Sequence, residues 1–249
     1  MTLRICSYNI HKGFSQFNRR MVVHELRDRL RTLDSDLVFL QEVQGLHLGH
    51  SQRHSGWPTQ PQHEFLAEEG WQQTAYGGNA IYDHGHHGNA ILSRHAILSQ
   101  TNQDVSDHRF ERRGLLHCEI QLPGIDLAAH CVCVHLGLGG GGRRRQMEAL
   151  AERMEGLVPE GAPLIIAGDF NDWRNHADKL LADRLGLVEA FGSGRGSPAR
   201  SYPSALPFFR LDRIYVRGFR VRRAEVHFGA PWAQISDHAA LTAELEPLA

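Results

Sequence analysis

The chain has 249 residues, 41 % of them hydrophobic, which is enough to bury a sizeable core and excludes an intrinsically disordered protein. Its 27 Lys and Arg residues balance 28 Asp and Glu residues, and the net charge of −1 disfavours an overall electrostatic grip on nucleic acid, although it permits a local basic patch. The sequence contains no signal peptide and no membrane-length apolar segment, and its cysteines lie in apolar runs, so we expect a cytoplasmic protein without disulfides.

The first part of the chain predicts a strand, a helix and a second strand. Residues 3–10 are typical of a buried strand, residues 19–33 carry helical spacing, and residues 36–42 (DLVFLQE) form another apolar run. A polar loop rich in Gly, His and Gln follows over residues 44–63, and its length favours either a functional rim or a mobile segment. A short helix is expected at residues 64–70.

The rest of the chain predicts more strands than helices. Short apolar runs spaced like antiparallel strands lie at residues 71–76, 88–94, 96–104, 113–122 and 125–135. The elements expected after them are a helix at 143–157, a strand at 163–169, a helix near 175–185 and strands near 212–217, 220–228 and 238–245. The helices are too few and too unevenly placed for a repeating βαβ barrel. We therefore predict one domain over residues 1–249, an α/β sandwich with helices on the outer faces of mixed sheets.

Polar residues gather where the apolar runs end or begin. These residues are Asn9, Glu42, Asp169, Asn171, Asp237 and His238. Taken singly, each has a structural explanation, such as a turn or a solvated strand end. Together they offer oxygen ligands for a hard divalent cation, a carboxylate to orient water, and a histidine that titrates near neutrality. The combination predicts metal-assisted hydrolysis of a phosphate ester.

Several segments also occur in the order typical of one known family. They are SYNIH (7–11), LQEV (40–43), HHGNAILS (86–93), CVHLG (133–137), IIAGDFND (165–172), LDRIYV (211–216) and ISDHAAL (235–241). The chain resembles the endonuclease/exonuclease/phosphatase superfamily from residue 3 to about 245, most of all a bacterial subgroup whose members are largely uncharacterised. The resemblance implies a DNase I-like fold of the α/β (α+β) class, a four-layer α/β/β/α sandwich of two mixed, largely antiparallel sheets.

The resemblance also implies roles for individual residues around a Mg²⁺ ion, for which Mn²⁺ is a possible substitute. Glu42 resembles the principal metal ligand, with Asn9 beside it and Asp237 on the metal side. Asp169 resembles the carboxylate that orients or deprotonates the attacking water. Asn171 resembles the residue that holds the phosphate or the water.

The remaining site residues are likewise implied by the resemblance. His238 matches the histidine that contacts the scissile phosphate, and Asp212 matches the carboxylate that pairs with it. His135 matches a second histidine that stabilises the leaving oxygen or the phosphate. Asn89 and Arg145 match positions that contact substrate in some members, but a turn at Asn89 and a solvated helix start at Arg145 explain them equally well.

The substrate stays open at the level of sequence. We expect a monomeric phosphoesterase acting on a phosphodiester or phosphomonoester of a small molecule or lipid head group, with a DNA or RNA endonuclease or exonuclease as the alternative. His11 stands where many nuclease members carry an acidic residue, which weakens the case for an abasic-site endonuclease. Trp57, Trp232, Phe208 and Phe209 either form an apolar rim for a lipid or belong to the core.

Two further motifs predict other functions. The run Gly137–Gly142 (GLGGGG) fits the G-x-G-x-x-G pattern of a dinucleotide fold, so a nicotinamide- or flavin-binding oxidoreductase is a remote alternative. Against it, we expect that the preceding strand does not open a βαβ unit. The histidines of segment 84–87 are a candidate transition-metal site, but their irregular spacing favours adventitious binding.

Overall fold

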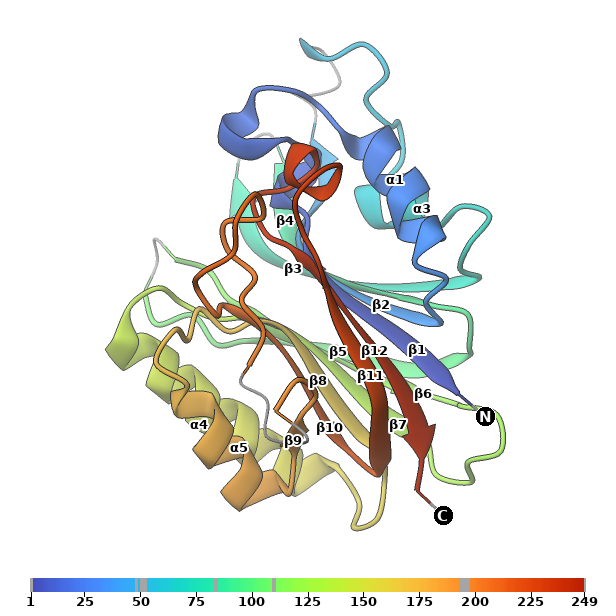
Figure 1. The fold of residues 1–249 in the computed structure, drawn as a ribbon, viewed down its shortest axis with the longest axis vertical. Helices are drawn as coiled ribbons and strands as arrows, with labels where there is room; N and C mark the ends of the chain where they lie inside the picture. The colour runs from blue at the N-terminus through green and yellow to red at the C-terminus, as the bar shows by residue number, and fades with distance from the viewer. Residues whose placement is uncertain are drawn as a thin grey trace.

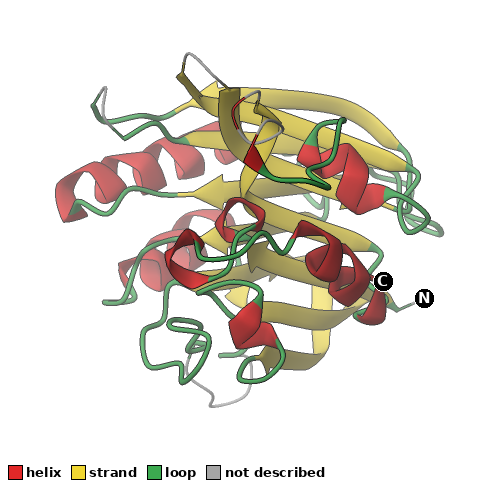
Figure 2. Ribbon diagram, turned by 90° about the horizontal axis from the view of Figure 1, so that it is seen from above, coloured by secondary structure: helices red, strands yellow, loops and turns green. Residues whose placement is uncertain are grey.

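Two six-stranded sheets packed face to face form the centre of the molecule in the computed structural model, and helices cover the outer face of each sheet (Figures 1 and 2). The structure describes residues 2–47, 49, 53–82, 85–108, 111–192 and 198–248, so His84 of the histidine segment lies outside the described residues. The arrangement confirms the predicted four-layer DNase I-like sandwich. Within the described residues, no helix is both long and apolar enough to cross a membrane.

The first sheet combines the N-terminal and C-terminal strands of the chain. In spatial order it contains β11 (Phe219–His227), β12 (Ala240–Pro247), β1 (Leu3–Asn9), β2 (Leu37–His47), β4 (Gly85–Ser93) and β3 (Gln73–Tyr82). The pair β1–β2 is parallel and the other neighbours are antiparallel. Among the described residues, α1 (Val23–Thr32) and α3 (Gln62–Ala67) lie on its outer face. Helix α1 buries Val23, Leu26 and Leu30, whose spacing places them on one helical face.

The second sheet is built from the middle of the chain. In spatial order it contains β5 (Ile97–Asp104), β6 (Gly114–Ile120), β7 (Ala129–His135), β8 (Leu164–Asp169), β10 (Asp212–Arg217) and β9 (Val188–Glu189). Helices α4 (Gly140–Leu157) and α5 (His176–Leu185) cover its outer face. The short helical turns are η1 (His11–Gly13), η2 (Gln16–Asn18) and η3 (Trp232–Gln234).

Strand β7 shows why the sandwich has three apolar layers. Cys131 and Cys133 point between the sheets, whereas Val132 and Val134 point toward α4 and α5, because side chains alternate along a strand. A strand buried on both faces therefore reads as a continuous apolar run. All four cysteines are buried and free, as the sequence predicted.

Several elements begin or end at residues other than the predicted ones. Strand β2 continues to His47 into the predicted polar loop, because a register shift between Leu40 and Val43 lets the strand go on pairing with β4. Helix α1 begins only at Val23, because Met21 is bridged to Phe14 and Val22 has a non-helical backbone with a φ of −130°. Helix α4 begins at Gly140, inside the glycine run.

The glycine run lies in a unit that the sequence interpretation had excluded. Strands β7 and β8 are parallel and α4 connects them, so the expectation that no βαβ unit begins here is wrong. A protein side chain nevertheless occupies the carbonyl groups of this loop. The buried guanidinium of Arg143 donates to the carbonyl oxygens of Gly137, at 3.1 Å, and Leu138, at 2.8 Å. These carbonyl groups therefore contact an arginine.

Gly168, the residue directly before Asp169, allows β7 and β8 to approach each other closely. Its φ is +149°, and a Cβ atom at this position would lie 2.0 Å from the carbonyl oxygen of Val134. We expect Gly168→Ala to lower the free energy of unfolding by about 2 kcal/mol or more, because overpacking costs about 1–3 kcal/mol even where the backbone is unstrained. Urea denaturation followed by circular dichroism measures the change.

Gly156 in α4 provides the matched control. A Cβ atom there meets nothing within 4 Å, and alanine is the better helix former. Gly156→Ala should leave the urea midpoint unchanged or raise it slightly. Equal midpoints for the two variants would contradict the close-approach explanation.

Candidate active site

A pocket of about 400 Å³ opens at one end of the sandwich and collects most of the predicted site residues. Those that line it are Glu42, His135, Asp169, Asn171, Asp237 and His238. Strand register explains three of the positions. Asp169 at the end of β8 lies opposite His135 on β7 and opposite Asp212 on β10. The central strands of the second sheet therefore bring these side chains into one row.

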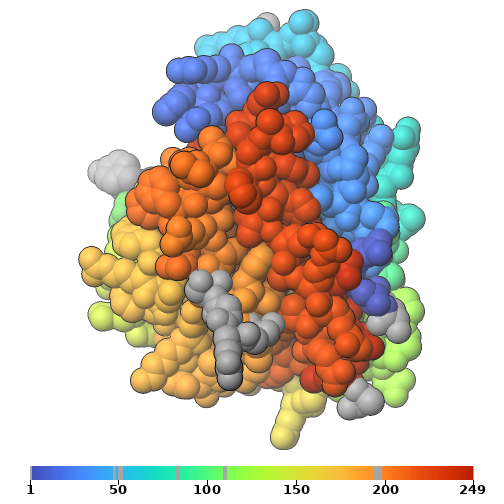
Figure 3. All heavy atoms as spheres, in the orientation of Figure 1, coloured from blue at the N-terminus to red at the C-terminus, as the bar shows by residue number. Residues whose placement is uncertain are grey.

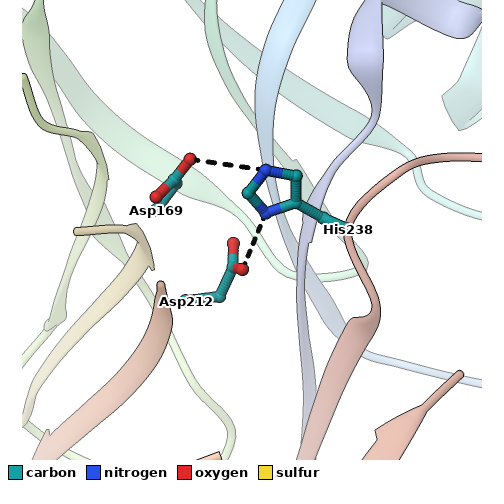
Figure 4. A group of neighbouring side chains, drawn as sticks. All are labelled: Asp169, Asp212 and His238. Atoms are coloured by element: carbon teal, nitrogen blue, oxygen red, sulfur yellow. Dashed lines mark hydrogen bonds and ion pairs between the residues drawn. The ribbon is translucent and has the colours of Figure 1, made fainter. Parts of the chain in front are cut away.

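His238 and Asp212 form the firmest contact of the site (Figure 4). Nδ1 of His238 lies 2.8 Å from Oδ2 of Asp212, and both residues are buried. The hydroxyl oxygen of Ser201 accepts from the Asp212 backbone amide at 3.1 Å. Burial disfavours the charged imidazole, but the Asp212 carboxylate outweighs burial and raises the pKa of His238 to about 10. The ring is therefore a cation at neutral pH, able to donate from Nε2 to a phosphate oxygen.

Asp169 lies at the centre of the row and is 2 % exposed. Its Oδ2 accepts from the Asn9 side chain at 3.2 Å and lies 3.5 Å from Nε2 of His135 and 3.9 Å from Nε2 of His238. Its Oδ1 accepts from the Asn171 backbone amide at 2.9 Å. Burial, together with the negative charge of Asp212, raises the pKa of Asp169 to about 7. A carboxylate with this pKa can accept a proton from water near neutral pH.

Asn171 and His135 complete this side of the pocket. Asn171 has a φ of 50°, and its side-chain amide donates to the carbonyl oxygen of Leu136 at 2.9 Å. The bond joins the loop after β8 to the loop after β7. Burial lowers the pKa of His135 well below the ordinary histidine range. His135 thus presents its ring to Asp169 mainly as a hydrogen-bonding group.

Glu42 and Asp237 form the acidic side. Glu42 lies in the β2 irregularity with a φ of 56°, a left-handed backbone that is uncommon outside glycine and typical of functional sites. Its Oε2 lies 3.2 Å from Nζ of Lys12, and Oδ1 of Asp237 lies 3.2 Å from Nδ1 of His11. Burial would raise the pKa of Glu42, but the basic groups around it, His135 and Lys12 foremost, lower it to about 2.

The acidic side has the donor chemistry of a Mg²⁺ site. Glu42, Asp237 and Asn9 offer carboxylate and amide oxygens, the ligands this cation prefers. The charge of the Glu42 carboxylate is balanced by the Lys12 ammonium, 3.2 Å from Oε2. Asp169, Asp212 and His238 form a second group whose ligand atoms lie within 4.8 Å of one another. In that group Nδ1 of His238 is already bonded to Asp212. Glu42, Asp237 and Asn9 offer oxygen donors, whereas the second group includes a histidine nitrogen, so the Glu42 side fits a hard divalent cation better.

Asn89 and Arg145 lie outside the set that lines the pocket. Asn89 is fully buried, and its amide donates to the carbonyl oxygens of Gly114, at 3.0 Å, and Cys133, at 3.2 Å, which ties β4 to the opposite sheet. Arg145 is exposed on α4 and its Nε pairs with Asp107 at 2.9 Å. Their contact with substrate stays a prediction.

The structure adds pocket residues that the sequence interpretation missed. Arg113 lines the pocket and donates from Nε to the carbonyl oxygen of Leu136 at 3.1 Å. Trp173 is 43 % exposed and lies 4.8 Å from the Arg143 guanidinium. The ring of Tyr202 lies 5.1 Å from that of His238. Only Trp173 had a local signal, because it directly follows the GDFND segment.

The aromatic residues proposed as a rim divide into two groups. Trp57 is buried and stacks on Phe14 with 5.5 Å between the ring centroids, and Trp232 is partly buried against the core of the first sheet, as the core interpretation predicted. Phe208 and Phe209 are 56 % and 42 % exposed, and Phe209 lines the pocket. Their loop is tied to the segment before β12, since Ser204 donates its backbone amide to the carbonyl oxygen of Asp237 at 2.7 Å. In Figure 3 this orange segment lies against the red-orange segment that precedes β12.

A comparison with protein families decides the membership of the chain. The model of the endonuclease/exonuclease/phosphatase family matches residues 6–238. The chain belongs to this family. Endonuclease/exonuclease/phosphatase proteins are hydrolases that act on phosphoester bonds, and they generally depend on a divalent metal ion. Membership overturns the oxidoreductase alternative that the glycine run had raised.

Individual relatives agree with the family match. The chain is similar to YbhP of Escherichia coli, described as an uncharacterized protein, with 46 % identity over 98 % of this chain and 96 % of that protein. A Beutenbergia cavernae structure of the endonuclease/exonuclease/phosphatase family aligns with a TM-score of 0.78 and 19 % identity over 99 % of this chain and 72 % of the other. The Bacteroides thetaiotaomicron mannosyl-6-phosphatase Bt3783 aligns with a TM-score of 0.72 and 17 % identity over 98 % and 99 %. These two structures share the fold.

Proposed function

We propose that this chain is a divalent-metal-dependent phosphoesterase that hydrolyses a phosphodiester or phosphomonoester by in-line attack of an activated water. One observation carries the proposal: in an accessible pocket, the Asp169 carboxylate lies 3.9 Å from Nε2 of His238, whose Nδ1 is held by Asp212 at 2.8 Å. A proton acceptor and a proton donor at this spacing suit a reaction in which water attacks and an alkoxide leaves.

Each side chain then has a role in the hydrolysis. Asp169 holds the attacking water and accepts its proton, while Asn9 and Asn171 keep the carboxylate in place. His238 donates from Nε2 to the phosphate and gives its proton to the leaving alkoxide, and Asp212 maintains its charge and orientation. A bound Mg²⁺ or Mn²⁺, held by Glu42, Asp237 and Asn9, would supply positive charge for the phosphate oxygens. His135 faces the same oxygens from β7.

The pocket walls support a small-molecule or lipid-linked substrate. Trp173, Tyr202 and Phe209, with Leu138 and Leu211, line the side next to the acidic and basic groups. A volume of about 400 Å³ is typical of small-ligand pockets, and an apolar wall beside a few polar groups suits an ester that carries an apolar group.

A matched substrate panel tests the proposal. Phospholipid head-group diesters, inositol phosphates, RNA, plasmid DNA and abasic DNA are offered with Mg²⁺ or Mn²⁺, and each reaction is repeated with a chelator. We expect chelator-sensitive turnover of a small or lipid-linked phosphoester. Turnover confined to DNA or RNA selects the nuclease alternative, and no turnover of any class contradicts the proposed activity.

Phe209→Ala tests the apolar wall separately. We expect the KM for a phosphoester of an apolar alcohol to rise about tenfold, because burying a phenylalanine side chain contributes roughly 1.5–3 kcal/mol. The KM for the matching ester of a polar alcohol should change little. Leu157, exposed at the end of α4, supplies the control variant Leu157→Ala. Equal effects of Phe209→Ala on both esters would contradict the assignment of this wall.

A further inference from the structure

Two consecutive basic residues reach the two carboxylates of the acidic side. His11 and Lys12 both have left-handed backbone conformations in η1, with φ values of 44° and 59°. His11 pairs with Asp237 and Lys12 pairs with Glu42, each at 3.2 Å. The turn therefore presents one basic group to each proposed metal-binding carboxylate.

A buried glutamine holds the partners of the Lys12–Glu42 pair together. Gln62, 2 % exposed at the start of α3, donates to the carbonyl oxygen of Lys12 at 2.9 Å. Its side-chain oxygen accepts from the backbone amide of Gln44, two residues after Glu42, also at 2.9 Å. A Cβ atom on Gly13 would lie 2.4 Å from the Gln62 amide nitrogen. The backbones that carry the ammonium and the carboxylate are thus braced by the same side chain.

The pair is also more sheltered than an ordinary surface ion pair. The side chains of Lys12 and Glu42 are 34 % and 20 % exposed. Charges in partly buried positions are screened less by water and salt than charges on the surface. A divalent ion arriving at Glu42 therefore meets a positive charge that is already held there.

Building on the proposed metal-dependent function, we propose that Lys12 is a resident cation of the site. Its ammonium group and a divalent ion compete for the Glu42 carboxylate.

Metal binding to the intact protein tests the competition without any substrate. In Mn²⁺ titration by calorimetry, Lys12→Met should bind the ion about five- to tenfold more tightly than the wild type, because the like-charge repulsion has gone. Lys12→Arg keeps the charge and should bind as the wild type does. Lys179, the only other lysine and exposed on α5, gives the control Lys179→Met, which should be unchanged.

Unchanged or weaker Mn²⁺ binding in Lys12→Met overturns the proposal. Melting curves recorded beforehand show that each variant is folded. Because these titrations use no substrate, they separate the failure of this inference from failure of the phosphoesterase proposal. A protein that shows the Lys12 effect but hydrolyses no ester loses only the proposed activity.

The presence of only two lysines permits a second readout. Reductive methylation modifies free amines, and peptide mass spectrometry compares Lys12 with Lys179 in one sample. Mn²⁺ should increase the methylation of Lys12 relative to Lys179, because the ion displaces the ammonium from Glu42. The increase should disappear in Glu42→Gln. A ratio that Mn²⁺ leaves unchanged or lowers in the wild type contradicts the competition.

Discussion

Replacing His238 with alanine is expected to lower kcat on the substrate identified by the panel by about 10²–10⁴-fold, the range that general acid–base groups supply. The variant loses the cationic imidazole, whose Nδ1 lies 2.8 Å from Oδ2 of Asp212. Steady-state kinetics at saturating metal measure the change. The control His176→Ala removes an exposed histidine at the start of α5 and should keep its rate.

The partner variant Asp212→Asn links the same prediction to pH. The Asp212 carboxylate raises the pKa of His238 to about 10 against the effect of burial, so its loss should lower that pKa. A donor must be protonated to act, and the variant should therefore lose activity at a lower pH than the wild type as the pH rises. If the activity of Asp212→Asn and of the wild type fell over the same alkaline pH range, His238 would not be the donor.

Glu42→Gln is expected to lower kcat about 10²-fold or more at a fixed Mg²⁺ concentration, because a metal ion supplies several kcal/mol of charge stabilisation in the transition state. The substitution keeps the shape of the side chain and removes its charge. Activity measured over a Mg²⁺ series should show a higher metal requirement together with a lower maximum.

Glu160→Gln is the matched control for this substitution, since Glu160 is exposed in the turn after α4. Its activity and metal requirement should equal those of the wild type. Near-normal turnover of Glu42→Gln at limiting Mg²⁺ would show that Glu42 is not a metal ligand. The metal site would then be sought at Asp169, Asp212 and His238, whose ligand atoms lie together.

Much of the architecture follows from local pattern. Apolar runs such as those of β7 and β8 predict strands buried on both faces, and the helical spacing of Val23, Leu26 and Leu30 predicts α1. Bulges are harder to predict. The segment ending in Glu42 has the pattern of a straight strand, and only its pairing with β4 reveals the register shift. The first residues of the predicted polar loop, 44–47, therefore belong to strand β2.

The sequence predicted those site residues that lie within recognisable motifs. GDFND and SDH contain Asp169 and His238, and the structure brings both into one pocket. Lys12 and Arg113 were missed because their importance arises from contacts between segments distant in sequence, Lys12 with Glu42 and Arg113 with Leu136. No periodicity within either segment encodes such a contact.

The row formed by His135, Asp169 and Asp212 has a consequence for how such a protein can diversify. These residues stand at the ends of adjacent central strands, whose interiors are packed on both faces. The apolar wall, by contrast, comes largely from loops, with Leu138 after β7 and Phe209 before β10. Insertions and exchanges in those loops can change the ester that is accepted while the residues proposed to act on its phosphate keep their spacing. Selection for a new substrate and selection for a stable core thus act on separate parts of the chain.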